Sequence, residues 1–69
     1  MESKQNNKLG IKIKALRQKA NLSQDELARK SDVAYTTLTK IETGVIKSPS
    51  VFVVEKIAKS LGVRIEDLI

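Results

Sequence analysis

The hydrophobic positions of this 69-residue chain recur at the spacing of short amphipathic helices. Residues 1–7 are polar and without periodicity, and we expect them to form a flexible N-terminal arm. After this arm, an apolar residue recurs every three or four positions: Leu9, Ile13, Leu16 and Ala20. The spacing predicts a first helix over residues 8–20 with one apolar stripe. Asn21 tolerates the left-handed backbone that closes helices, so the helix should end there.

A second helix is predicted by the run Ser23-Gln-Asp-Glu26, which matches a capping box. In this motif the Ser23 side chain accepts the backbone N–H of Glu26, and the Glu26 side chain accepts the backbone N–H of Ser23. Leu22, Leu27 and Ala28 supply inward contacts, and the helix ends near residues 30–31. Asp32 follows, where its tolerance of unusual backbone angles suits a tight turn into the next helix.

A third helix is predicted over residues 35–42, with Leu38 and Ile41 directed inward and Ala34 one turn earlier. Its outward positions form one continuous polar stripe without an acidic side chain: Tyr35, Thr36, Thr39, Lys40 and Thr43. Gly44 should end this helix, because glycine readily adopts the left-handed conformation of a C-cap.

A fourth helix should begin after Ser50 as its N-cap and end at Gly62. Its inward residues are expected to be Val51, Val54, Ile57, Ala58 and Leu61. Residues 63–69 look like one or two last helical turns, with Ile65 and Leu68 packing inward. The pattern therefore predicts a compact all-α domain over residues 8–69.

Composition narrows the possible functions. The chain contains no cysteine and no histidine, which removes thiol nucleophiles, the usual metal ligands and the commonest general base. We therefore expect no enzyme, no metal site and no cofactor. No apolar run approaches the roughly 20 residues of a membrane span, and the N-terminus does not resemble a signal peptide, so we expect a cytoplasmic protein with no membrane partner.

Charge is concentrated at one end of the chain. The net charge is +5, and the first 20 residues carry all of it, with six basic residues against Glu2. The basic residues of this segment are Lys4, Lys8, Lys12, Lys14, Arg17 and Lys19. Such an excess fits an ordinary solvated helix face, but it also fits a polyanion such as duplex DNA.

Two short helices joined by a three- or four-residue turn, the second with a polar outer stripe, are typical of a helix-turn-helix. The chain resembles the phage lambda repressor and Cro-like helix-turn-helix family of transcriptional regulators over roughly residues 9–68. The resemblance lies in the order and spacing of five blocks: residues 13–17, Leu22 to Ala28, Leu38 to Gly44, Pro49-Ser50, and Lys56 to Val63. It implies a five-helix fold that binds double-stranded DNA through the major groove.

The resemblance also assigns roles to individual residues. Base edges would be contacted by Tyr35, Thr36, Thr39 and Lys40. DNA phosphates would be contacted by Gln24, Thr43 and Lys47. Arg17 and Glu42 match an ion pair that ties the first helix to the third. The alternative is that Gln24 and the outer stripe are simply solvated polar positions.

The sequence departs from the family pattern at three turn or cap positions. Asp32 stands where glycine is common, and Ala34 and Arg64 replace frequent helix caps. The Ala34 cap should be weaker by about 1 kcal/mol. These departures affect local stability more than the fold.

The fourth helix carries apolar residues at usually polar positions, namely Phe52 and Val53. With Ile46 and Ile69 they could form an uncovered patch, and we expect a homodimer through it. Alternatively, Phe52 packs against its own chain.

The expected function is sequence-specific transcriptional regulation, most simply as a repressor. The rival is a protein-interaction module with a protein partner, such as the antitoxin of a toxin-antitoxin pair.

Overall fold

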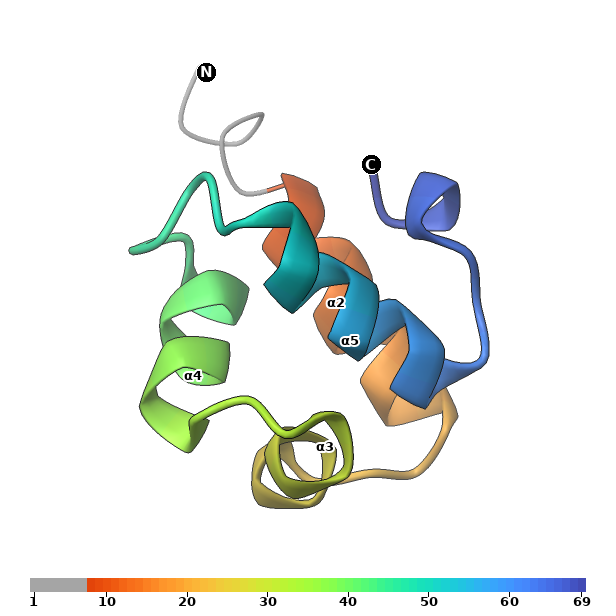
Figure 1. Cartoon of the computed structure of the whole chain (residues 1–69). Coiled ribbons are helices and arrows are strands. Elements are labelled where there is room, and N and C mark those ends of the chain that lie inside the picture. The colour runs from red at the N-terminus through yellow and green to blue at the C-terminus, as the bar shows by residue number, and fades with distance from the viewer. Residues whose placement is uncertain (1–7) are drawn as a thin grey trace.

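The computed structural model describes residues 8–69, so the expected arm over residues 1–7, together with Lys4, lies outside the described residues. The helices of the described part are α2 (Lys8–Lys19), α3 (Gln24–Ser31), α4 (Tyr35–Thr43), α5 (Val51–Leu61) and the 3₁₀ helix η1 (Ile65–Asp67) (Figure 1). Residues 8–69 contain no strand, which confirms the all-α class.

The expectation of five helices is wrong by one, because the last of them is a single 3₁₀ turn rather than an α-helix. Seven residues remain after Gly62. The backbone N–H of Arg64 donates to the Asp67 carboxylate at 3.0 Å, and the Asp67 N–H donates to the Arg64 carbonyl at 2.9 Å. These short-range bonds close one tight turn, and 3₁₀ geometry is common in such short terminal pieces.

The helix boundaries follow the local signals in the sequence. Both bonds of the capping box are present, from the Glu26 N–H to the Ser23 hydroxyl at 3.0 Å and from the Ser23 N–H to the Glu26 carboxylate at 2.8 Å. The chain turns through left-handed backbone at Asn21 (φ 63°) and Asp32 (φ 58°). Gly44 is the left-handed C-cap of α4, as expected.

The core gathers apolar side chains from every element. The largest fully buried side chains are Ile13, Leu27, Leu38, Ile41, Ile57 and Leu68. In Figure 1, α5 crosses in front of α2, while α4 and α3 close the left and lower sides. Helix α2 packs chiefly on α4, and α3 packs on both α4 and α5. Helix α4 therefore rests on a continuous core.

Three residues expected to point inward are exposed instead: Ala20, Ala34 and Val51. Each lies at a helix end, where helical periodicity no longer fixes the direction of the side chain. Helix α2 ends at Lys19, so Ala20 falls in the turn, and Ala34 is the extended N-cap residue of α4. On α2 the buried residues are Ile13, as expected, together with Gly10 and Arg17.

Helices α3 and α4 are joined by the three residues 32–34, which is the expected helix-turn-helix connection. Val33 is buried between them, and its N–H donates to the Ala28 carbonyl at 3.0 Å. Within residues 8–69, no helix is long and apolar enough to cross a membrane.

Candidate nucleic-acid interface

The outer face of α4 carries the expected polar stripe. Leu38 and Ile41 are fully buried beneath it. Tyr35 is half exposed, Thr39 is intermediate, and the remaining members of the stripe are exposed: Thr36, Lys40 and Thr43. Because α4 buries one side on the core, its helical periodicity presents all five residues to solvent on the opposite side.

The charge of this face is positive. The only acidic residue in α4 is Glu42, which lies on the buried side with 5% of its surface exposed. Lys40 is the only basic residue of the helix and is exposed. A ligand approaching the outer face of α4 therefore meets one cation and no anion from this helix.

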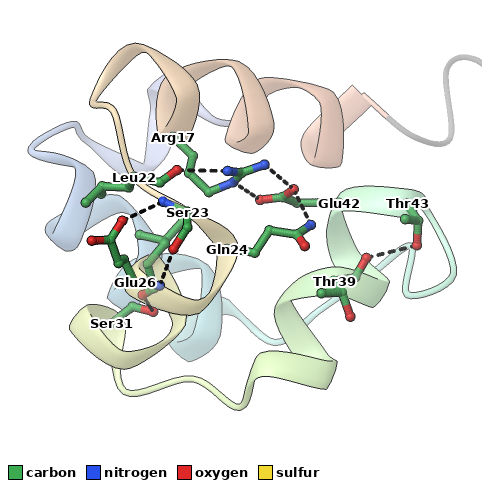
Figure 2. Close-up of polar contacts among 10 residues, drawn as sticks. Arg17, Leu22, Ser23, Gln24, Glu26, Ser31, Thr39, Glu42 and Thr43 are labelled. Atoms are coloured by element: carbon green, nitrogen blue, oxygen red, sulfur yellow. Dashed lines mark hydrogen bonds and ion pairs between the residues drawn. The ribbon is translucent and has the colours of Figure 1, made fainter.

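Two threonines of the stripe bond to the helix itself. The Thr39 hydroxyl donates to the Thr36 carbonyl at 2.9 Å. The Thr43 hydroxyl donates to the Thr39 carbonyl at 2.9 Å (Figure 2). Each hydroxyl oxygen retains acceptor capacity after donating its one hydrogen.

Beneath the stripe, Arg17 and Glu42 form a buried ion pair between α2 and α4. The Arg17 Nε donates to Glu42 Oε2 at 2.8 Å, and its Nη2 donates to Glu42 Oε1 at 3.1 Å. The Arg17 Nη1 also donates to the Leu22 carbonyl at 2.8 Å. These bonds join α2, the turn that follows it and α4, and so fix the position of α4 (Figure 2).

Gln24 belongs to the same network, which the sequence did not reveal. Its Nε2 donates to Glu42 Oε1 at 2.9 Å, and its side chain lies between α3 and Glu42 in Figure 2. Gln24 and Glu42 are 18 positions apart, so their contact depends on the packing angle of α3 against α4. Gln24 has a second amide hydrogen, which leaves it one donor beyond the bond to Glu42.

Lys47 lies in the loop that leaves α4. This loop is tied back to the helix by the Ile46 N–H, which donates to the Lys40 carbonyl at 3.0 Å. Lys47 is exposed, so its positive charge faces solvent just after the C-terminal end of α4. The structure thus places Gln24, Thr43 and Lys47 at the start of α3, at the end of α4 and in the following loop.

The apolar residues expected at the pairing surface divide into two groups. Val53 is half-buried against the core, whereas Phe52 is 72% exposed and Ile69 is 74% exposed. Phe52 therefore does not pack into the core formed by residues 8–69. Val51 and Ile69 line a shared apolar depression with Leu9 and Leu68.

Comparison with known proteins agrees with this architecture. The family model described as "Helix-turn-helix" matches residues 13–68. An uncharacterized HTH-type transcriptional regulator of Methanocaldococcus jannaschii is 44% identical over 57 residues, covering 83% of this chain and 85% of the relative. The control protein C.BamHI of Bacillus amyloliquefaciens is 39% identical over 61 residues, covering 87% of this chain and 74% of the relative.

No solved structure gives a significant match. Nothing in the family match or in the two relatives favours the antitoxin alternative. The helix-turn-helix connection, the buried support beneath α4 and the match over residues 13–68 lead to one assignment. The chain belongs to the helix-turn-helix family of DNA-binding transcriptional regulators.

Proposed function

We propose that this chain binds a specific duplex DNA site by inserting α4 into the major groove, and that it acts as a repressor by occupying that site. The observation that carries the proposal is the exposed, acid-free outer face of α4. A helix with its side chains is about 10–12 Å across, which matches a major groove about 12 Å wide. Nothing on α4 opposes the approach of a phosphate backbone.

Base edges are contacted by four residues of the outer stripe: Tyr35, Thr36, Thr39 and Lys40. Lys40 can donate to the O6 and N7 acceptors of guanine, and Tyr35 combines a ring with a hydroxyl donor. The buried bonds between Arg17 and Glu42 support this role, because they limit rocking of α4 against α2.

Phosphates are contacted by Gln24, Thr43 and Lys47, which position the protein on the duplex. The bond from Gln24 to Glu42 supports this role for Gln24, since it fixes the amide while leaving a second N–H for a phosphate oxygen.

The active species is a homodimer that pairs through α5 and the C-terminal residues. One recognition helix covers few base pairs, and two-fold pairing lets two copies read half-sites about 34 Å apart. Phe52 and Ile69 support pairing through this surface, because both side chains are large and apolar and neither is covered within residues 8–69. Val53 contributes the part of its surface that the core leaves open.

Selection of the 69-residue chain against random duplex DNA tests the proposal. We expect enrichment of a palindromic site whose half-sites are one helical turn apart. Binding to that site should weaken steeply as salt rises, because each neutralised phosphate releases counterions. No enriched sequence, or an affinity insensitive to salt, would contradict the proposal.

Lys40→Ala identifies the contribution of α4 on the selected site. If Lys40 contacts a base, we expect a loss of about 1 to 3 kcal/mol concentrated at one base position. A uniform loss with a shallower salt dependence would instead assign Lys40 to phosphate. Lys30→Ala, in the last turn of α3, is the matched control and should bind as the wild type does. Unchanged binding by Lys40→Ala would exclude Lys40 from the interface.

A further inference from the structure

Thr39 occupies the middle of the outer stripe, and its only donor is already used. Its Oγ1 lies 2.9 Å from the Thr36 carbonyl oxygen, one turn back along α4. A hydroxyl has one hydrogen and two acceptor lone pairs. Toward solvent, Thr39 therefore presents an acceptor oxygen and a methyl group rather than a donor.

The bases differ in how they meet such a group. In the major groove, guanine presents only the acceptors N7 and O6, whereas adenine and cytosine each present an amino group that donates. To bond guanine, Thr39 would have to break its bond to the Thr36 carbonyl and exchange one partner for another. To bond an amino group, it keeps that bond and gains a second.

The neighbouring stripe residues sharpen the contrast. Lys40 is adjacent in sequence and can only donate, so it pairs with acceptors such as guanine O6 and N7. Thr36 lies in the first turn of α4, and its hydroxyl makes no hydrogen bond within residues 8–69. Among the four residues proposed to contact bases, Thr39 is thus the one whose hydroxyl hydrogen already bonds a carbonyl of the helix, so it is left as an acceptor.

We infer that Thr39 is a specificity-determining residue whose Oγ1 accepts a hydrogen bond from the exocyclic amino group of adenine or cytosine. The inference rests on the proposed function and deepens it, since it states the base chemistry that one position of α4 recognises. Thr43 also donates its hydroxyl within the helix, to the Thr39 carbonyl, so the phosphate contact proposed for Thr43 requires its hydroxyl to exchange that bond for one to a phosphate oxygen. The sequence alone leaves Thr39 free to donate or accept, whereas its bond to Thr36 selects acceptance.

Base analogues in the selected site test the inference. Each adenine of a half-site is replaced in turn by purine, and each cytosine by 2-pyrimidinone, which removes only the amino group. We expect one position at which this removal weakens wild-type binding about two- to tenfold, the effect of one net hydrogen bond. Thr39→Ser keeps the hydroxyl and should show the same loss, while Thr39→Val lacks the acceptor and should show none there.

Two further arms separate this role from its rivals. Thr36→Val is the matched control and should retain the sensitivity at the position assigned to Thr39. If 7-deazaguanine, which lacks N7, weakens the wild type but not Thr39→Val at a shared position, then Thr39 donates to guanine and the inference is overturned. The inference is also overturned if the wild type and the Thr39 variants differ only in their response to replacing thymine with uracil, which removes the thymine methyl group. Thermal melting checks that each variant is folded.

Failure of this inference is distinguishable from failure of the proposed function. If no site is enriched from random DNA, the proposed function fails before any analogue is made. If a site is enriched but amino-group removal affects the wild type and Thr39→Val equally at every position, only the role of Thr39 fails.

Discussion

At the scale of single residues, Glu42 is a buried carboxylate that bonds groups from two other helices. Its oxygens accept from Arg17 of α2 and from Gln24 of α3, and 2% of its side-chain surface is exposed. Glu42→Ala would leave the buried Arg17 guanidinium without its partner, and breaking one member of such a pair costs about 3 to 5 kcal/mol. We expect a loss of this size in the free energy of unfolding, measured by urea denaturation.

The exposed pair between Arg29 and Asp25 provides the matched control. Its side chains are 74% and 61% exposed, so Asp25→Ala should cost less than about 1 kcal/mol. The double variant Arg17→Met/Glu42→Leu should stay closer to the wild type than Glu42→Ala does, because it leaves no unpaired buried charge. Equal losses for Glu42→Ala and Asp25→Ala would show that the buried pair contributes no more than a surface pair.

Gln24 shows where prediction from the sequence stops at the residue scale. Its place at the start of α3 follows from Ser23 as N-cap, and the polar face of α4 follows from helical periodicity. The bond from Gln24 to Glu42 follows from neither, because it joins residues 18 positions apart across two packed helices. The directions of the threonine hydroxyls were also left open, since a hydroxyl can donate or accept at the same position.

At the scale of helices, the capping box of α3 makes stability depend on pH. The Ser23 backbone N–H, followed by the Ser23 hydroxyl, lowers the pKa of Glu26 below its usual 4.5. A carboxyl group whose pKa is lower in the folded state stabilises the fold above its unfolded pKa, and this contribution is lost as pH falls through the folded pKa. We expect wild type to be more stable than Glu26→Gln at pH 7, and the difference to shrink below pH 4.5.

Urea unfolding of the two proteins at neutral and acid pH checks this expectation. Glu55→Gln, on the exposed side of α5 and outside any capping box, is the control for loss of a negative charge. A difference between wild type and Glu26→Gln that grows on acidification would contradict the capping role of the Glu26 carboxylate.

Helix α4 begins without a side-chain cap, which predicts a stabilising substitution. Ala34 is its N-cap residue, at φ −59° and ψ 140°, and makes no side-chain hydrogen bond. This extended backbone suits a serine whose oxygen accepts an N–H of the first turn. Ala34→Ser should therefore raise the free energy of unfolding by about 1 kcal/mol. Ser50→Ala should lower it by about 0.5 to 2 kcal/mol, because the Ser50 oxygen accepts the Val53 N–H in α5.

Helix ends also mark the limit of the sequence analysis at this scale. Caps at Ser23, Ser50, Gly44 and Gly62 act through neighbouring backbone groups, so local sequence was sufficient to place the boundaries. Whether a side chain at those ends is buried depends on the packing of the other helices, which the neighbouring sequence does not determine. Val51 is exposed although it continues the apolar stripe of α5, because at the first turn the core lies beneath the following residues Val54 and Ile57.

At the scale of the whole molecule, the proposed homodimer depends on apolar surface that residues 8–69 leave uncovered. Phe52 is 72% exposed, so Phe52→Glu removes little packing within the chain and should leave the stability of the monomer itself nearly unchanged, apart from whatever stabilisation the dimer adds. In a dimer that buries this surface, the same change places two carboxylates in an apolar contact, where unpaired charges are costly. We expect sedimentation equilibrium to show a dimer for the wild type and a monomer for Phe52→Glu at the same concentration.

Loss of the dimer should weaken operator binding more than it weakens binding to a single half-site, because the monomer no longer gains from the second contact once the first has formed. Ile11→Glu is the matched control: Ile11 is 54% exposed on α2, outside the α5 surface, and the substitution changes the net charge equally. If both variants remain dimers, the pairing surface lies elsewhere. If the wild type stays a monomer even on an operator with two half-sites, each copy binds alone. The outer stripe of α4 then accounts for all of the sequence specificity.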